Sequence, residues 1–318
     1  MSSAPVVVAP KETPALRRPA ASGRQRVAPS RRAKVQLASV GRGSFPTRAG
    51  AFALGTLWLL VVIIPIYYMV LTSFRSQSQY LSANAWLPTG GLSLSSWAAV
   101  FSSTGLWRDF INSVIYSAGT IVVVVVVSLF AAYRIVRRGS RFAGISFNVI
   151  LFGLAIPIQA LLIPNYVIMV KLRLYDTLYG LVLVTAASLV AISVLLTVNY
   201  VRLIPEELYD AMAIDGASER TVLARLVWPM ARPVLGVVSI FAGLAAWNNF
   251  ILPLILTESN SKAVLPLGLY TISTTSSGYG VSVPIVMAGV IFSVLPVLFL
   301  FLAMRRQFVK GIGGFALR

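Results

Sequence analysis

Six uncharged apolar stretches dominate the sequence, and each is about 22–26 residues long. At roughly 1.5 Å of rise per residue, a helix of that length crosses a hydrocarbon core of roughly 30 Å. Charged residues make up only 11% of the chain, whereas a soluble domain usually carries about 25%. We therefore expect an all-α integral membrane protein with six transmembrane helices. The expected spans are Ala51–Phe74, Phe110–Tyr133, Ile145–Val170, Leu178–Val201, Val234–Thr257 and Val283–Met304.

The basic residues are distributed unevenly between the segments that connect these spans. If the N-terminus lies in the cytoplasm, all but five of the 27 Lys and Arg residues fall on the cytoplasmic side. The five on the other side are Arg75, Arg108, Lys171, Arg173 and Lys262. This asymmetry satisfies the positive-inside rule and predicts a multi-pass protein with both termini in the cytoplasm.

Residues 1–48 differ from the rest of the chain. They contain ten Lys or Arg residues and one acid, Glu12, and no apolar periodicity runs through them. We expect a disordered basic cytosolic tail over 1–48, followed by a six-helix transmembrane domain over 49–318. The tail is either an unstructured extension or a contact for anionic lipid heads. Because the positive charge does not form a folded basic surface, we expect no nucleic-acid partner.

Several kinds of chemistry are excluded by the residue types present. The chain has no cysteine and no histidine, which removes disulfides, Cys/His metal sites and His- or Cys-based catalysis. It also lacks the Gly-x-x-x-x-Gly-Lys-Ser/Thr phosphate loop. No charged residue falls within an expected span, which disfavours ion-coupled transport. We therefore expect no catalytic residue, no metal and no bound cofactor in this chain.

The fourth connection, Arg202–Pro233, is unusually long and acidic for a cytosolic loop. A first short helix is expected to begin with Pro205 and to end at Gly216, which can adopt the left-handed conformation. A second helix is expected to begin near Ser218 and to stop before Pro229. The loop contains five of the nine acids of the chain, namely Glu206, Glu207, Asp210, Asp215 and Glu219.

The first of these helices should have one narrow apolar face. Leu208, Ala211 and Met212 follow the i, i+3, i+4 spacing that places side chains on one side of a helix. Such a face can pack back on the ends of the membrane helices, or it can enter a groove on a partner. The spacing alone leaves both uses open.

The order of residues in this loop is similar to a known motif. Asp210-Ala-Met212 is followed by Gly216, then by nine residues and Leu226-Val-Trp-Pro229. This resembles the EAA loop of the permeases of binding-protein-dependent ABC importers, with pattern Glu-Ala-Ala, three residues, Gly, nine residues, Ile-x-Leu-Pro. In that family the loop forms a coupling helix that sits in a cleft of a cytosolic ATPase. The resemblance implies that the coupling residues here are Glu207, Asp210, Ala211, Met212, Asp215, Gly216, Ala217 and Pro229.

Three further segments resemble the carbohydrate branch of these permeases. They are Ile156-Pro-Ile-Gln159 with Leu162-Ile-Pro164, Trp247-Asn-Asn-Phe250 with Leu252-Pro-Leu254, and Arg306-Gln-Phe-Val-Lys-Gly311 through Gly314. The similarity covers about residues 50–318 and is closest to the maltose-type second permease. It implies the fold of a type I ABC importer permease in a bacterial or archaeal cytoplasmic (inner) membrane.

The resemblance also implies a function and a set of partners. The chain would translocate a sugar or oligosaccharide, and glycerol phosphate is the alternative solute within the same class. Its partners would be a second homologous permease in a heterodimer, a cytosolic ATPase dimer that binds ATP and Mg²⁺, an extracytoplasmic solute-binding protein and membrane lipid. A secondary transporter and a non-transporting scaffold are the rival classes, and the motif spacing argues against both.

Uncharged polar side chains inside the spans are the candidates for a solute path. Sugars are neutral and need amide or hydroxyl partners and aromatic faces. The first candidates are Trp247, Asn248, Asn249, Gln159 and Asn112. Three successive helical positions cover about 200°, so Trp247, Asn248 and Asn249 cannot all face one pore. Hydrogen bonding between helices is the alternative role for each of these residues.

Overall fold

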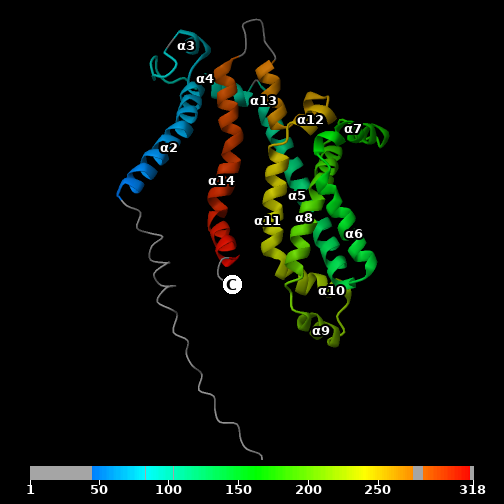
Figure 1. Cartoon of the computed structure of the whole chain (residues 1–318). Coiled ribbons are helices and arrows are strands. Elements are labelled where there is room, and N and C mark those ends of the chain that lie inside the picture. The colour runs from blue at the N-terminus through cyan, green and yellow to red at the C-terminus, as the bar shows by residue number, and fades with distance from the viewer. Residues whose placement is uncertain (1–44, 83, 103, 275–281, 316–318) are drawn as a thin grey trace, which may run out of the picture. The chain divides into compact units, whose positions relative to one another are not determined.

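The computed structural model describes residues 45–82, 84–102, 104–274 and 282–315, and every regular element in these ranges is helical. The long helices are α2 (Phe45–Ser73), α5 (Leu106–Arg138), α8 (Leu178–Val201), α11 (Trp228–Trp247) and α14 (Val283–Phe315) (Figure 1). The shorter α-helices are α3 (Gln77–Ser82), α4 (Ser95–Ser102), α6 (Arg141–Phe152), α7 (Leu162–Lys171), α9 (Glu206–Ile214), α10 (Glu219–Val222), α12 (Ile251–Leu256) and α13 (Leu265–Thr274). Single turns of other helix types are η1 (Gly153–Ala155), η2 (Ile158–Leu161), η3 (Leu223–Val227) and η4 (Asn260–Lys262). The predicted all-α class is confirmed.

The described helices match the apolar stretches of the sequence in order. Four of them are long and apolar enough to cross a membrane, namely Ala49–Ser73, Leu106–Arg137, Leu178–Val201 and Glu219–Trp247. A fifth candidate is the pair Arg141–Ala155 and Ile158–Lys171, and Val283–Phe299 is a shorter apolar helix. The chain is therefore a helical membrane protein, while the number of six complete crossings stays a prediction.

The third apolar stretch, expected as one transmembrane helix over Ile145–Val170, is broken into two helical halves. Its two halves are bent by 97° at a break around Pro157. Proline disfavours the helical conformation of the residue before it, and Ile156 is accordingly extended, with φ −91° and ψ 116°. Pro157 itself is extended, with ψ 134°. The helix therefore ends at Ala155 and resumes in another direction.

The chain divides by its internal contacts into residues 1–62 and residues 63–318. The described part of the first unit is the beginning of α2, where large apolar side chains such as Phe52 and Trp58 are exposed. Helix α2 begins at Phe45, within the segment 1–48 that was expected to be a disordered tail. Residues 1–44 of that tail lie outside the described residues.

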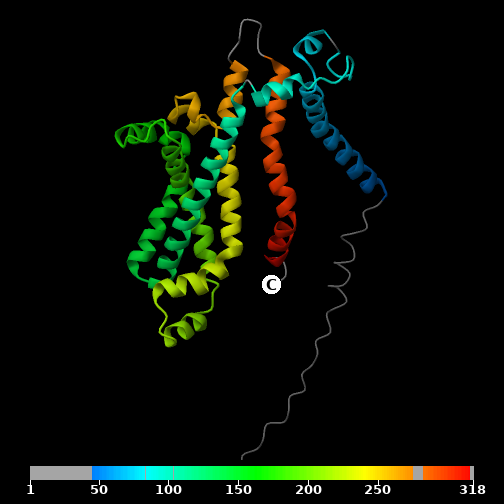
Figure 2. The same cartoon turned by 180° about the vertical axis from the view of Figure 1, so that it is seen from behind.

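The core of the second unit forms where α5 packs against both α8 and α11. In both views α5 and α8 lie side by side (Figure 2). Small and β-branched residues fill this contact, including Val124, Ala132, Val198 and Ala242, each 1% exposed or less. Small side chains let helix backbones approach closely, which favours helix association in lipid.

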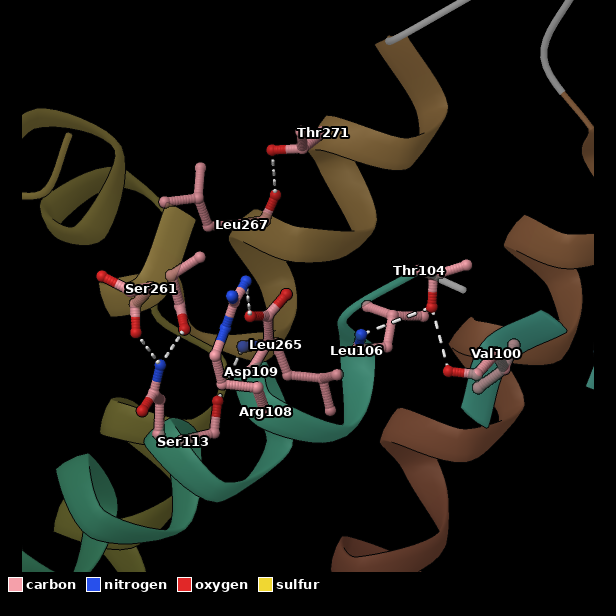
Figure 3. Close-up of polar contacts among 12 residues, drawn as sticks. Val100, Thr104, Leu106, Arg108, Asp109, Ser113, Ser261, Leu265, Leu267 and Thr271 are labelled. Carbon is pink, nitrogen blue, oxygen red and sulfur yellow. Dashed lines mark hydrogen bonds and ion pairs between the residues drawn. The ribbon is translucent and has the colours of Figure 1, made fainter. Parts of the chain in front are cut away.

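The beginning of α5 is joined to the segment around α13 by hydrogen bonds. Figure 3 shows Ser113 of α5 beside Leu265, whose backbone N–H donates to the Ser113 hydroxyl over 2.8 Å. The side chain of Asp109, one turn earlier, is only 4% exposed and lies 3.3 Å from the Arg108 guanidinium. The sequence places this carboxylate one residue before an expected span and gives no sign that it is buried.

Candidate functional site

A cavity of about 450 Å³ lies between the η2 turn, α8 and the break between α11 and α12. Among the described residues that line it, none is charged. They are Ile158, Gln159, Leu162, Thr185, Ser188, Leu189, Ala245, Asn248, Asn249, Phe250, Ile251 and Leu252. The cavity therefore combines amides, hydroxyls and an aromatic ring with an apolar wall, as binding pockets for neutral polar molecules do.

The amides reach this cavity because helix α11 ends beside it. Asn248 is the first residue after α11, and its side-chain amide donates to the Leu244 carbonyl over 2.9 Å. The Asn249 side-chain oxygen accepts from the backbone N–H of Leu252 in α12 over 3.3 Å. Helix ends leave backbone groups without intrahelical partners, and asparagine side chains satisfy them. Asn249 satisfies the Leu252 N–H in this way and so stabilises the break in the fifth apolar stretch, whereas the Leu244 carbonyl also accepts the backbone N–H of Asn248 over 3.0 Å.

Asn249 also links three helical segments in the wall of the cavity. Its side-chain nitrogen donates to the hydroxyl of Tyr116 in α5 over 3.1 Å. The Tyr116 hydroxyl lies 2.6 Å from the hydroxyl of Thr185 in α8. Tyr116 is fully buried, so these partners satisfy a hydroxyl that lipid could not. The interhelical role considered for these amides therefore holds for Asn249.

Gln159 and Asn248 are both exposed and line the same cavity. Gln159 comes from η2, directly after the 97° bend, so the bend brings it opposite the end of α11. Phe250, which packs edge-on against Tyr270 with ring centroids 5.1 Å apart, adds an aromatic face. Ser188 adds a hydroxyl that the sequence analysis did not single out.

Two of the five candidates for a solute path lie elsewhere. The Trp247 indole N–H donates to the Ser293 carbonyl over 3.2 Å, and its ring packs edge-on against Phe110. The Asn112 side-chain nitrogen donates to the carbonyls of Ser261 and Ala263 over 3.0 and 2.8 Å. Neither residue lines the cavity, because neighbours distant in the sequence hold each side chain away from it.

The acidic loop folds as one short helix, α9, followed by a helical segment that begins at α10 and continues into α11. Glu206 and Glu207 occupy the first turn of α9, where the positive end of the helix dipole favours acids. Gly216 follows the helix with φ +68°, as predicted for a left-handed terminating residue. The Ala217 N–H donates to the Met212 carbonyl over 2.9 Å, which closes the last turn.

Helix α9 packs on the membrane helices through Tyr209, which lies beside the predicted apolar face. Tyr209 is 3% exposed, and with Met212 it joins the core that includes Tyr133 of α5. Leu208 is 40% exposed, Ala211 is exposed, and Ile214 of the same face is 86% exposed. Of the predicted apolar face, Met212 packs on the membrane helices, whereas Leu208 and Ala211 stay exposed. The alternative use of this face, entry into a groove on a partner, stays a prediction. Asp210 and Asp215 are exposed as well.

The second helix was expected to stop before Pro229, but it continues past this residue. Ser218 caps α10 by accepting from the Thr221 N–H over 3.3 Å. The chain then passes through the π-helical turn η3 into α11, with Pro229 in its first turn. A proline ring clashes with the carbonyl four residues earlier in a regular α-helix, and the wider π turn removes that conflict. The segment Glu219–Trp247 is thus one long helical stretch.

These features together define a class: an all-helical membrane protein with a pocket suited to a neutral polar molecule and an acidic helical loop. A family comparison makes the class specific. Residues 124–313, which include the pocket and the loop, match the family described as binding-protein-dependent transport system inner membrane component. The chain belongs to this family, which confirms the resemblance found from the loop.

Individual relatives cover most of the chain. It is 30% identical to the arabinooligosaccharides transport system permease protein AraQ of Halalkalibacterium halodurans, over 79% of this chain and 90% of that protein. It is 31% identical to the lactose transport system permease protein LacG of Rhizobium radiobacter, over 79% and 90%. It is 27% identical to the diacetylchitobiose uptake system permease protein NgcG of Streptomyces coelicolor, over 82% and 85%.

Proposed function

We propose that this chain is the permease subunit of an ATP-driven importer that translocates a sugar or oligosaccharide delivered by a solute-binding protein. The similar proteins named above belong to transport systems for arabinooligosaccharides, lactose and diacetylchitobiose. The uncharged cavity at the break between α11 and α12 is the observation that carries the proposal. A neutral solute with many hydroxyls matches amide and hydroxyl groups beside an aromatic ring.

Within this cavity, Gln159 and Asn248 are the side chains proposed to contact the solute, and Phe250 is proposed to stack on it. Asn249 contributes chiefly by holding the wall through Tyr116. A glycerol phosphate would bring a negative charge, and the described residues that line the cavity offer no cation to pair with it. The sugar is therefore preferred to the anionic alternative.

The outer face of α9 is proposed to dock on a separate ATPase dimer, which would bind ATP and Mg²⁺. Ile214 is 86% exposed and lies beside Ala211, with the acids Glu207, Asp210 and Asp215 around them. An exposed apolar patch ringed by charges is typical of a helix that enters a groove on a partner. The further partners proposed are a second homologous permease, an extracytoplasmic binding protein and lipid. The loop would then face the cytoplasm, as would both termini, in a bacterial or archaeal inner membrane.

Replacement of Gly216 tests the coupling role of this loop. Proline fixes φ near −65°, whereas Gly216 has φ +68° and donates its N–H to the Ala213 carbonyl over 3.0 Å. We expect Gly216→Pro to abolish ATP-dependent uptake of radiolabelled oligosaccharides while the chain remains in the membrane. Gly216→Asn is the matched control, because asparagine tolerates the left-handed region and should retain most uptake. Uptake by Gly216→Pro equal to that of the wild type would refute the coupling assignment.

A further inference from the structure

A second cavity, of about 180 Å³, lies where the end of α5 meets α9 and α10. It is separate from the proposed sugar cavity and shares no residue with it. Its described lining combines two arginines and two tyrosines with one carboxylate. The residues are Tyr133, Arg134, Arg137, Tyr209, Ala213, Ala217, Glu219 and Val222.

The charges that line this cavity do not cancel. Arg134 and Arg137 lie one turn apart on α5, and Glu219 is the one acid among the described lining residues. Glu219 lies 2.8 Å from Arg134, but its side chain is 70% exposed. Exposed ion pairs contribute little to stability and exchange readily with solvent. The cavity therefore has an excess of one positive charge, and its acid can move away.

Tyr209 supplies a hydrogen-bond donor that its surroundings leave unused. The Arg137 guanidinium lies over its ring at 4.4 Å from the centroid. The Tyr209 side chain is buried, and among the described residues its hydroxyl has no hydrogen-bond partner. Burial raises the pKa of this hydroxyl, so it remains a donor. A buried donor without a partner is costly, and such groups mark places where a ligand or water binds.

We propose that this cavity binds a phosphate group through the guanidinium groups of Arg134 and Arg137 and the hydroxyl of Tyr209. Arginines favour phosphate because their planar N–H groups match its oxygens in pairs. In this proposal Glu219 competes with the phosphate for Arg134. The source is either the headgroup of an anionic phospholipid or a soluble phosphate ester.

The position of the cavity gives a bound phosphate a consequence for coupling. Tyr209 belongs to α9, whereas both arginines belong to α5. A phosphate held by all three would join the loop to the membrane helix. This consequence rests on the proposed function, in which α9 transmits motion from an ATPase and this end of α5 faces the cytoplasm. Basic pockets at that side of a membrane are known places for anionic headgroups.

The test uses the purified full chain without nucleotide, in detergent for the phosphate probe and in nanodiscs for the headgroup probe. Binding of inorganic phosphate is measured by isothermal titration. Binding of a headgroup is measured as the rise in thermal unfolding temperature when nanodiscs of phosphatidylcholine are replaced by nanodiscs containing phosphatidylglycerol. The variants are Arg134→Gln, Tyr209→Phe and Glu219→Gln. Arg202→Gln is the matched control, since Arg202 is an exposed arginine that lies over a ring, Phe147, at 5.4 Å.

The site predicts a distinct pattern among these variants. Arg134→Gln and Tyr209→Phe should weaken phosphate binding about tenfold, since each loses a hydrogen bond to a charged group. Glu219→Gln should strengthen binding, because the competing carboxylate is gone. Arg202→Gln should bind as the wild type does. A response to nanodiscs alone would identify the lipid headgroup as the source, and a response to both probes would identify a phosphate group of either origin.

Two results would overturn the site. One is no response of the wild type to either probe, and the other is equal binding by the wild type, Tyr209→Phe and Glu219→Gln. Either of these results can be distinguished from failure of the proposed transport function. A chain that binds phosphate as described but supports no ATP-dependent uptake would keep the site and refute the transport role.

Discussion

The side-chain amide of Asn249 donates to the hydroxyl of Tyr116 over 3.1 Å, across 133 residues of sequence. The same hydroxyl lies 2.6 Å from that of Thr185. One buried hydroxyl therefore holds the break after α11 against both α5 and α8. This bond fixes the wall of the proposed sugar cavity, so the geometry of the pocket depends on a residue that does not line it.

Tyr116→Phe should destabilise the chain by about 1–3 kcal/mol, because Asn249 and Thr185 would each lose a buried partner. Thermal unfolding in detergent measures the effect. Ser188→Ala is the control, since the Ser188 hydroxyl donates only to the Val184 carbonyl of its own helix over 3.0 Å. Equal unfolding temperatures for the two variants would show that the interhelical network contributes nothing.

Gly180→Ala should destabilise the chain by about 1–3 kcal/mol, as expected when an atom is forced into a packed site. A Cβ at Gly180 would overlap the backbone carbonyl of Leu174, which a side-chain rotation cannot relieve. Gly144→Ala is the matched control, since Gly144 is also helical and an added Cβ there meets nothing within 4 Å. The unfolding temperatures of both variants, measured without denaturant, test this prediction. A Gly180→Ala variant as stable as Gly144→Ala would contradict the packing described.

Ile214→Glu should lower the amount of ATPase that co-purifies with the chain by more than about tenfold, because a charge would be placed in an apolar contact. The Ile214 side chain is 86% exposed, so the fold itself should be unaffected. Leu203→Glu is the control, since Leu203 is 70% exposed in the same loop but precedes α9. If both variants retained the ATPase equally, the outer face of α9 would not be the docking surface.

The carboxylate of Asp176 should make stability depend on pH. Burial alone would raise its pKa, but hydrogen bonds from the Ser259 hydroxyl and the backbone N–H groups of Glu258 and Ser259 lower it below the usual 3.8. A lowered pKa stabilises the folded state above the unfolded value, and that contribution is lost as pH falls through the folded value.

We therefore expect wild type to exceed Asp176→Asn in unfolding temperature at pH 7, with a gap that narrows below about pH 4. Asparagine is a suitable replacement because Asp176 has φ +54°, a conformation that asparagine tolerates. Melting curves of both proteins from pH 3 to pH 7 provide the measurement. A gap that stays constant over this range would mean that the ionised carboxylate is not the stabilising group.

The sequence predicts those parts of the fold that depend on local chemistry. Hydropathy places the apolar stretches, and the dipole preference places Glu206 and Glu207 in the first turn of α9. The left-handed conformation of Gly216 and the cap at Ser218 follow from the same local rules. These features need no knowledge of neighbours far along the chain.

Features that depend on distant neighbours could not be predicted in this way. Hydropathy is insensitive to direction, so it predicts one span over Ile145–Val170 and does not predict the bend at Pro157. The inward face of α9 is set by Tyr209, which meets Arg137 from α5. Trp247 and Asn248 are adjacent, yet only Asn248 faces the cavity, because Trp247 is held by Ser293 and Phe110.

The most direct test of the central claim is to purify the tagged full chain from its host in mild detergent and to identify every co-purifying protein by mass spectrometry. The proposed function predicts one ATPase, a second permease with its own acidic loop of the same spacing, and a solute-binding protein that binds a neutral sugar. Recovery of the chain alone, or only with proteins unrelated to transport, would contradict the account.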